Sequence, residues 1–547
     1  MITLQSSLAI SKSLRLCTIP CVTASMLVGF PLAGMAQQAA PDASPAPIQA
    51  SASSPVFRIS GFNVTGENPL PEGETSKVLA PFLRADASLE TLQKATTALE
   101  AALRVKGFAL HRVALPPQEL GTTVTLNIVK FVIGKVTVEG LANYTEANIR
   151  ASLPELTEGT APNFKTLSVQ TAIANESQGK QVQVGLKEAE EADQIDAKVV
   201  VKESKPWNFA TSLANVGTST TGNDRLTFAG GHANVFGLDH QFTGAYTTSI
   251  ERPSDVRQIG LNYRVPMYRW GGVLGASYTR SDVVGNNGSF TNNGAGQTLG
   301  LNYNHYLPPD GGYRSYLTAG LDDKLFYAPT ITAGAVTTVT GPELRSRSMS
   351  IGYNARVESD TSVWGYSTDL VFSVASSDGN LPGTSTPNWR ALRASGNYLT
   401  SFGGGWLWSA RGQLQVSPDV LISGEQFGFG GSSTIRGARE DQRITGDTGL
   451  FASTEISTRE LAPGLRLLGF LDAGWKMSNG TNVTNVSLAR DSMSSIGLGL
   501  RFASPSGIVV SADYGRVVAG SAVSLTDNPN SAQSGNEKIH VNLSFRF

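Results

Sequence analysis

The last ten residues, KIHVNLSFRF (residues 538–547), predict how the larger part of this chain folds. Apolar and polar side chains alternate along them without a break. Successive side chains of a β-strand point to opposite faces, so the segment predicts a strand with one apolar and one polar face. The apolar face carries Ile539, Val541, Leu543, Phe545 and Phe547.

Segments of the same character recur upstream as far as residue 207, separated by Gly, Asn, Asp and Pro. We predict about sixteen strands, an even number, each long enough to cross a bilayer when tilted. Backbone groups in lipid must all be paired, so a closed barrel is the arrangement without exposed edges. The alternative, a soluble β-sandwich, would rarely need so long an unbroken meander. The strands are expected near 207–217, 224–236, 239–250, 256–266, 270–281, 296–307, 312–323, 345–358, 362–375, 388–401, 405–417, 449–460, 464–475, 493–503, 507–517 and 537–547.

The start of the chain predicts export across the inner membrane. Lys12 and Arg15 precede a long apolar stretch, and small residues suited to a signal peptidase follow it. We therefore expect a signal peptide over residues 1–36. Both cysteines, Cys17 and Cys21, lie inside it, so the mature chain is expected to have no disulfide or thiol chemistry.

Two small α+β domains are predicted between the export signal and the barrel. Residues 37–55 are rich in Ala, Pro, Ser and Gln, which predicts a disordered linker. Two successive β-α-α-β-β series then follow, and we assign them to domains over 56–130 and 131–205, with the barrel over 206–547. A single α+β domain is the alternative interpretation of this stretch. The first predicted helix has apolar residues at helical spacing, with cap residues at its two ends: Leu92, Ala95, Leu99 and Leu103, and Ser88 and Gly107.

The sequence gives no indication of catalysis, of a metal or of a cofactor. Five histidines are scattered without ligand spacing, and no HExxH, Walker A or GxSxG motif occurs. His540 could face a barrel lumen, but no serine or acid is placed beside it, so a barrel hydrolase is not favoured. The net charge of −1 gives no general reason to expect nucleic-acid binding.

The longest predicted loop of the barrel's C-terminal half, roughly residues 418–448, has an unusual composition. Its centre places an isoleucine and an arginine among glycines. Glycines permit tight turns and arginine seeks acids, which suits a loop folded back into a polar lumen. A solvated, mobile loop is the alternative, and on this sequence alone it is favoured. The residues concerned are Gly430, Gly431, Ile435, Arg436 and Gly437.

A carboxylate on a later strand offers a partner for the arginine. In the strand predicted over 464–475, the odd positions suit lipid, so Asp472 is expected to face the lumen. A carboxylate there needs a cation, and Arg436 is a suitable one. Arg466 lies on the same face and is the competing candidate.

These residues resemble the paired motifs of the TpsB (ShlB/FhaC/HecB) family of two-partner secretion translocators. One motif is the glycine-flanked loop with Arg436, and the other is Phe470-Leu471-Asp472-Ala473-Gly474. Gly107-Phe108 and the segment 112–118 are similar to the first periplasmic POTRA domain of that family. Ala438 departs from the family, which usually has an aromatic residue there. A further resemblance, to the assembly signal of outer-membrane barrels, lies in the terminal aromatics Phe545 and Phe547.

The resemblance implies an outer-membrane protein translocator of type V secretion, as in haemolysin secretion and activation. The POTRA domains would capture a large unfolded TpsA-type exoprotein in the periplasm, and the barrel would pass it outward. Arg436 would be the loop-tip arginine, with Asp472 as its strand partner. The other expected partners are outer-membrane lipid and, during biogenesis, the barrel assembly machinery. The alternatives are a BamA/TamA-like assembly factor, which usually has more periplasmic domains, and a passive porin, which would not need them.

Overall fold

The computed structural model describes residues 56–119, 121–283, 285–287, 290–292, 295–327, 330–333, 336–339, 342–377 and 385–547. The signal peptide predicted over 1–36 and the linker predicted over 37–55 lie outside these described residues. The contacts between residues divide the described chain into two compact units, with the boundary after Lys130. The first small domain is one of these units. The second small domain and the barrel together form the other.

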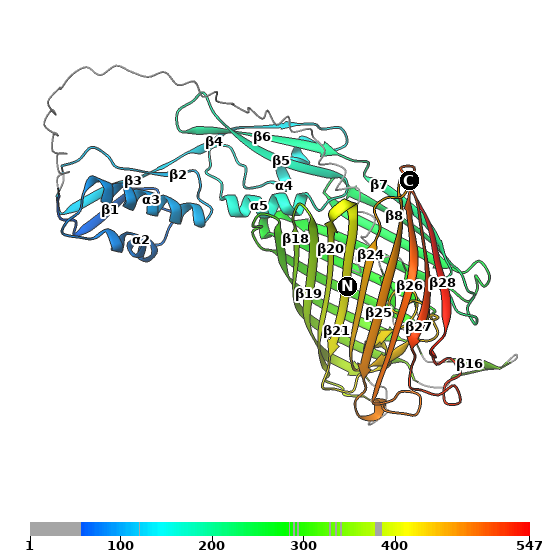
Figure 1. The fold of residues 1–547 in the computed structure, drawn as a ribbon. Helices are drawn as coiled ribbons and strands as arrows, with labels where there is room; N and C mark the ends of the chain where they lie inside the picture. The colour runs from blue at the N-terminus through cyan, green and yellow to red at the C-terminus, as the bar shows by residue number, and fades with distance from the viewer. Residues whose placement is uncertain are drawn as a thin grey trace, which may run out of the picture. The chain divides into compact units, whose positions relative to one another are not determined.

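The first domain packs two helices on a three-stranded sheet (Figure 1). In the sheet, β3 lies centrally, parallel to β1 and antiparallel to β2. The predicted apolar stripe of the long helix is fully buried, and Ser88 forms a capping box at its start. Gly107 follows its end with a φ of 99°, as expected for a C-terminal cap. The elements are β1 (Gly61–Gly66), α2 (Glu72–Leu79), η2 (Ala80–Phe82), α3 (Leu89–Val105), β2 (His111–Ala114) and β3 (Thr123–Lys130).

The second domain repeats this arrangement with its own sheet. Its strand order, β4-β6-β5, corresponds to β1-β3-β2, with β4 parallel and β5 antiparallel to the central β6. Two separate sheets therefore precede the barrel, rather than one shared sheet. No helix among the described residues is long and apolar enough to cross a membrane. The elements are β4 (Val132–Glu139), α4 (Glu146–Ser152), α5 (Phe164–Ala174), β5 (Lys180–Glu188) and β6 (Gln194–Glu203).

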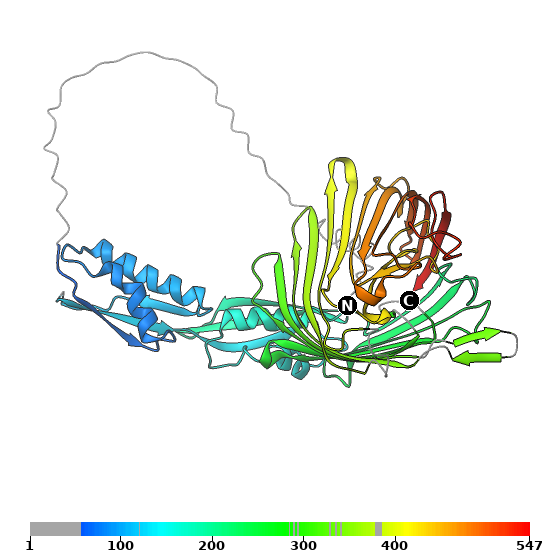
Figure 2. The ribbon, with the colours of Figure 1, turned by 90° about the horizontal axis from the view of Figure 1, so that it is seen from below.

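The remainder of the described chain forms a closed antiparallel barrel, which the views of Figures 1 and 2 show curving into a ring. Each strand pairs with the next along the chain, and the last strand, β28, closes the ring on β7. Each predicted strand overlaps one observed strand, so the predicted fold class is confirmed. The barrel strands are β7 (Trp207–Ala214), β8 (Arg225–Val235), β9 (His240–Thr248), β10 (Gln258–Met267), β11 (Gly272–Ser281), β14 (Gly296–Tyr306), β15 (Tyr313–Phe326), β18 (Leu344–Glu358), β19 (Ser362–Ser377), β20 (Arg390–Phe402), β21 (Trp406–Val416), β24 (Thr448–Ser457), β25 (Leu465–Met477), β26 (Arg490–Ala503), β27 (Ile508–Ala519) and β28 (Glu537–Arg546).

The two ends of the barrel differ. The end that follows the second domain has short turns, whereas the opposite end carries longer loops, as outer-membrane barrels do. The longest loop in the C-terminal half spans residues 417–447 between β21 and β24. The loops and turns also contain short elements: η3 (Tyr268–Trp270), β12 (Gly285–Asn287), β13 (Phe290–Asn292), β16 (Thr330–Ala333), β17 (Val336–Val339), η4 (Gly403–Gly405), η5 (Ser423–Glu425), β22 (Phe427–Phe429), β23 (Ile444–Gly446) and η6 (Gly480–Asn482).

Candidate functional site

The loop over residues 417–447 is folded back against the inner wall of the barrel. Its two arms pair with each other as β22 and β23. The segment between the two arms packs against residues of β26 and β27. Phe429, Ile435 and Ala438 of this loop are completely buried. The solvated loop that the sequence alone favoured is therefore wrong, and the alternative of a loop in the lumen is correct. The buried apolar cluster consists of Phe427, Phe429, Ile435, Ala438, Ile444, Phe451, Met493, Val517 and Ala532.

The glycines of the loop allow its sharp turns. Gly430, Gly431 and Gly437 have φ angles of 124°, 87° and 97°, a region that residues with a side chain rarely adopt. The Gly430 N–H donates to the Thr434 hydroxyl at 2.7 Å, and the Ser432 N–H donates to a Glu440 carboxylate oxygen at 2.7 Å. The loop therefore has a defined internal structure that presents Arg436 at its tip.

The predicted contact between Arg436 and Asp472 is present. Nη2 of Arg436 donates to Oδ1 of Asp472 at 2.7 Å, and Nε donates to Oδ2 at 2.8 Å. The Arg436 backbone N–H adds a third hydrogen bond to Oδ2 at 3.1 Å. The two side chains are 2% and 0% exposed, so this is a buried bidentate ion pair.

A second carboxylate also binds the arginine. Glu455 of β24 accepts a hydrogen bond from Nη1 of Arg436 at 2.6 Å. The Phe470 ring lies below the guanidinium, with its centroid 3.4 Å from Cζ. The Ser453 hydroxyl donates to Oδ1 of Asp472 at 2.7 Å, and Oδ2 of Asp513 on β27 lies 3.7 Å from Nη1 of Arg436. Glu455 was not predicted from the sequence, although side-chain alternation places it on the same face as Ser453 of β24.

Glycines of the barrel wall make room for the loop. A Cβ at Gly515 of β27 would lie 2.5 Å from the Arg436 carbonyl carbon, and one at Gly474 would lie 2.5 Å from the Phe429 ring. The loop backbone and an aromatic side chain thus occupy the space of two missing side chains. Gly474 belonged to the predicted motif, and this contact gives it a physical role. Gly515 was not predicted.

The other residues singled out in the sequence lie at different places. Arg466 donates to the carbonyl oxygens of Gly405 and Thr458 at the turn end of β25, so its predicted competition for Asp472 is wrong. His540 does face the loop, where its Nε2 accepts a hydrogen bond from the Gly437 N–H at 3.3 Å. Phe547 is 81% exposed at the end of the chain.

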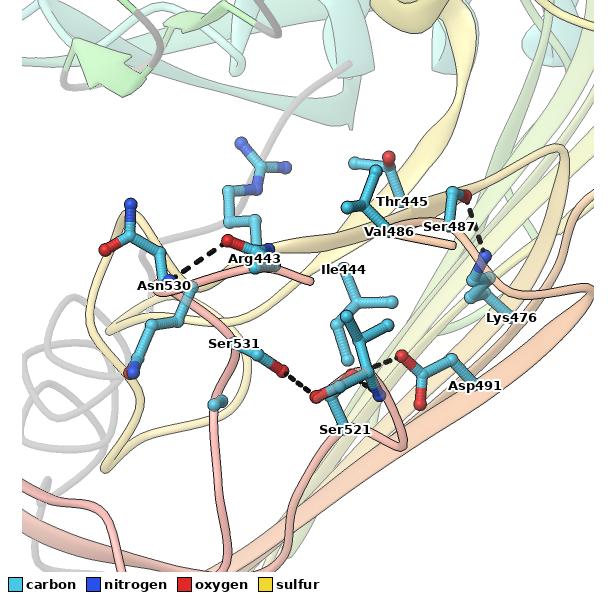
Figure 3. A pocket seen from close by; sticks show the side chains of 14 residues that line it. Arg443, Ile444, Thr445, Lys476, Val486, Ser487, Asp491, Ser521, Asn530 and Ser531 are labelled. Atoms are coloured by element: carbon cyan, nitrogen blue, oxygen red, sulfur yellow. Dashed lines mark hydrogen bonds between the residues drawn. The ribbon is translucent and has the colours of Figure 1, made fainter. Parts of the chain in front are cut away.

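The second arm of the loop, at residues 442–445, lines a small pocket together with residues of two outer loops (Figure 3). Lys476, at its edge, donates to the Ser487 hydroxyl at 3.1 Å and to the Leu488 carbonyl at 2.6 Å. Asp491 accepts from the Ser521 hydroxyl at 2.6 Å. These polar groups therefore hold the outer loops in place above the folded-in loop.

This chain is similar to known outer-membrane transporters. Residues 193–502 match the family described as haemolysin secretion/activation protein ShlB/FhaC/HecB, and residues 57–130 match the ShlB-type POTRA domain. Outer membrane transporter CdiB of Escherichia coli is 24% identical over 446 residues, covering 78% of this chain and 74% of the relative.

Two solved structures share the fold. CdiB from Escherichia coli has a TM-score of 0.72 at 19% sequence identity, covering 91% of this chain and 92% of that chain. CdiB from Acinetobacter baumannii has a TM-score of 0.68 at 17% identity, covering 90% and 91%.

Proposed function

We propose a function from one premise: this chain belongs to the ShlB/FhaC/HecB family of haemolysin secretion/activation proteins. The family comprises outer-membrane transporters of two-partner secretion, which work with a secreted partner and carry POTRA domains in the periplasm. It is a transporter family and not a family of enzymes. We infer that this chain captures an unfolded partner exoprotein in the periplasm and secretes it through the barrel. The family description names both secretion and activation of haemolysins, and we propose that secretion likewise activates the partner of this chain.

The observation that supports this proposal is a barrel lumen that holds a loop by side-chain contacts: a charged cluster at its tip, the buried apolar cluster, and the ion pairs of Glu425 with Lys324 and Arg393. The tip is fixed by the Arg436 contacts with Asp472 and Glu455, whereas the barrel strands are held by continuous backbone pairing. The loop can therefore leave the wall without breaking the barrel. We propose that it does so when the partner passes.

The lumen wall suits an extended polypeptide. Ser367 and Ser395 face one another across β19 and β20, with their hydroxyl oxygens 2.7 Å apart. Polar wall groups of this kind exchange hydrogen bonds with a passing backbone and offer no large apolar surface to retain it. Folding of the partner outside the cell would then supply the direction of transport.

We propose two further partners, one for the outer surface of the barrel and one for residues 545–547. Leu467 and Leu471 of β25 are about half exposed on the outer face, which we propose contacts outer-membrane lipid. The exposed Phe547, together with Phe545, is proposed to be recognised by the barrel assembly machinery during insertion.

Site-specific photocrosslinking tests the proposed route. A photoreactive residue at Ser395 faces the lumen, and the same residue at the neighbouring Ala394 faces lipid and serves as the matched control. The chain is expressed in its native host cells, where the proposed exoprotein partner would be present, and crosslinks to secreted protein are collected. We expect adducts with the exoprotein at Ser395 and none at Ala394. An exoprotein that is secreted normally without an adduct at Ser395 would contradict passage through this lumen.

A further inference from the structure

The second periplasmic domain is joined to the barrel by a buried ion pair. Lys180 opens β5, and its side chain is 0% exposed. Its Nζ donates to Oδ2 of Asp239 at 2.6 Å and to Oδ1 of Asn148 at 3.0 Å. The same ammonium lies 5.0 Å from the centroid of the Tyr144 ring. Because the Lys180 ammonium is shielded from water, its charge depends on these neighbouring groups for stabilisation.

Asp239 is fixed from the barrel side. It lies in the turn between β8 and β9 with a φ of 62°, and its N–H donates to Oδ1 of Asn234 at 2.9 Å. The Tyr268 hydroxyl, from the turn between β10 and β11, donates to Oδ2 of Asp239 at 2.8 Å. One carboxylate therefore connects the second domain with two neighbouring turns of the barrel.

Further contacts surround this ion pair. Nη2 of Arg264 on β10 binds Oε2 of Glu176 at 2.8 Å. Apolar side chains of α5 pack against the barrel end beside it, and the cluster comprises Val169, Ile173, Val273 and Tyr306. The contact area is thus both apolar and charged, with the Lys180–Asp239 ion pair as its most deeply buried polar part.

The burial of both charges opposes separation of the domain from the barrel. Desolvation by burial lowers the pKa of the Lys180 ammonium, whereas the negative charge of the Asp239 carboxylate raises it. Removal of one partner leaves the other charge buried and unpaired, which is strongly unfavourable.

We propose that Lys180 and Asp239 are positioning residues that keep the second periplasmic domain attached to the barrel turns throughout secretion. The domain then acts as a fixed extension of the barrel entrance, aligned with the lumen through which the partner passes. This inference rests on the proposed function, because alignment matters only if a polypeptide is delivered to the lumen.

The attachment itself is tested by distance measurements between two spin labels. The cysteines are introduced at Lys187, on the second domain, and at Asp360, in a barrel turn, and both positions are exposed. We expect a narrow distance distribution in the full-length protein and a clearly broader one in Lys180→Met. The matched control is Lys198→Met, which removes an exposed ion pair with Glu139 in the same domain and should leave the distribution narrow.

A double variant separates a loss of attachment from a loss of folding. Lys180→Met with Asp239→Asn removes both charges, and asparagine tolerates the positive φ of position 239. We expect this variant to recover a narrower distribution than Lys180→Met alone. An unchanged distance distribution in Lys180→Met would overturn the role of the ion pair. This measurement does not depend on the proposed secretion function.

Secretion supplies the second measurement. Lys180→Met should lower partner secretion roughly tenfold at wild-type membrane levels, since an unpaired buried charge weakens the attachment. Cysteines at Gln178 and Asn208, whose side chains meet at 2.9 Å, allow a short crosslinker to tether the domain to β7. The tether should leave partner secretion by the otherwise unchanged protein at its normal level. In Lys180→Met it should restore partner secretion. A tether that stops secretion would overturn the inference, because the domain would then have to detach.

Discussion

Two buried cations, Arg436 in the lumen and Lys180 at the second domain, hold parts of this protein together in different ways. Arg436 uses its planar fork to bind Asp472 and Glu455, both on barrel strands. Lys180 binds one carboxylate, Asp239, in a turn. We propose that the lumen contact opens during transport and that the domain contact persists. Burial alone therefore does not distinguish a contact that must break from one that must not.

The largest effect is expected at Arg436. Arg436→Ala leaves Asp472 buried beside Glu455 without its cation, at a cost of about 3–5 kcal/mol, reduced where water enters the lumen. We expect secretion to be abolished or strongly reduced while the barrel still reaches the membrane, because strand pairing does not involve the loop. Arg439→Ala is the matched control, since Arg439 lies in the same loop with a half-exposed side chain paired with Asp441. Normal secretion by Arg436→Ala at wild-type levels would refute the role of this residue.

A smaller, graded effect is expected for the two carboxylates. Asp472→Ala should reduce secretion more than Glu455→Ala, because Asp472 accepts three hydrogen bonds from Arg436 and Glu455 accepts one. A secretion assay at equal membrane amounts gives the order. The opposite order would make Glu455 the main partner and would change the assignment of the motif.

An exchange of the two charges, Arg436→Asp with Asp472→Arg, tests how far Asp472 alone holds the arginine. Glu455 remains beside position 436, and the new aspartate would face it at close range. We therefore expect little rescue of secretion by the double exchange. Full rescue would mean that Glu455 contributes nothing to the site.

The smallest change with a predicted effect is a single methyl group. Gly515→Ala places a Cβ against the Arg436 carbonyl group, so the loop must shift from the wall. We expect raised single-channel conductance in planar bilayers and reduced secretion. Gly469→Ala is the control, because its Cβ would meet its nearest neighbour at 3.9 Å. Equal conductance of the two variants would contradict close packing at Gly515.

The sequence predicted those features that depend on local side-chain alternation. Alternation placed the strands and assigned Asp472 to the lumen, because the period of a strand is fixed by its geometry. It also placed Arg466 on that face, but six residues of strand separate the two by roughly 20 Å, so a shared face did not mean contact. The odd or even position of a residue in a strand predicts which face it lies on, but not which residue it contacts.

The contacts that sequence reasoning missed depend on distant segments. Nothing in the sequence distinguishes Gly515 from the many other glycines of the strands, because its role comes from its contact with the loop. Lys180 finds its partner Asp239 in another domain, at a turn whose place beside β5 follows only from the packing of α4 and α5 on the barrel end. No spacing or composition near either residue encodes that proximity.

The most direct test of the account compares two tethers in one secretion assay. Cysteines at Gln442 and Asn536, whose side chains meet at 3.2 Å, allow a short crosslinker to fix the loop to the outer segment before β28. The Gln178–Asn208 tether fixes the second domain instead. The account predicts that the loop tether stops secretion until it is cleaved, whereas the domain tether leaves secretion at the untethered level. Normal secretion with the loop tethered, or none with the domain tethered, would contradict it.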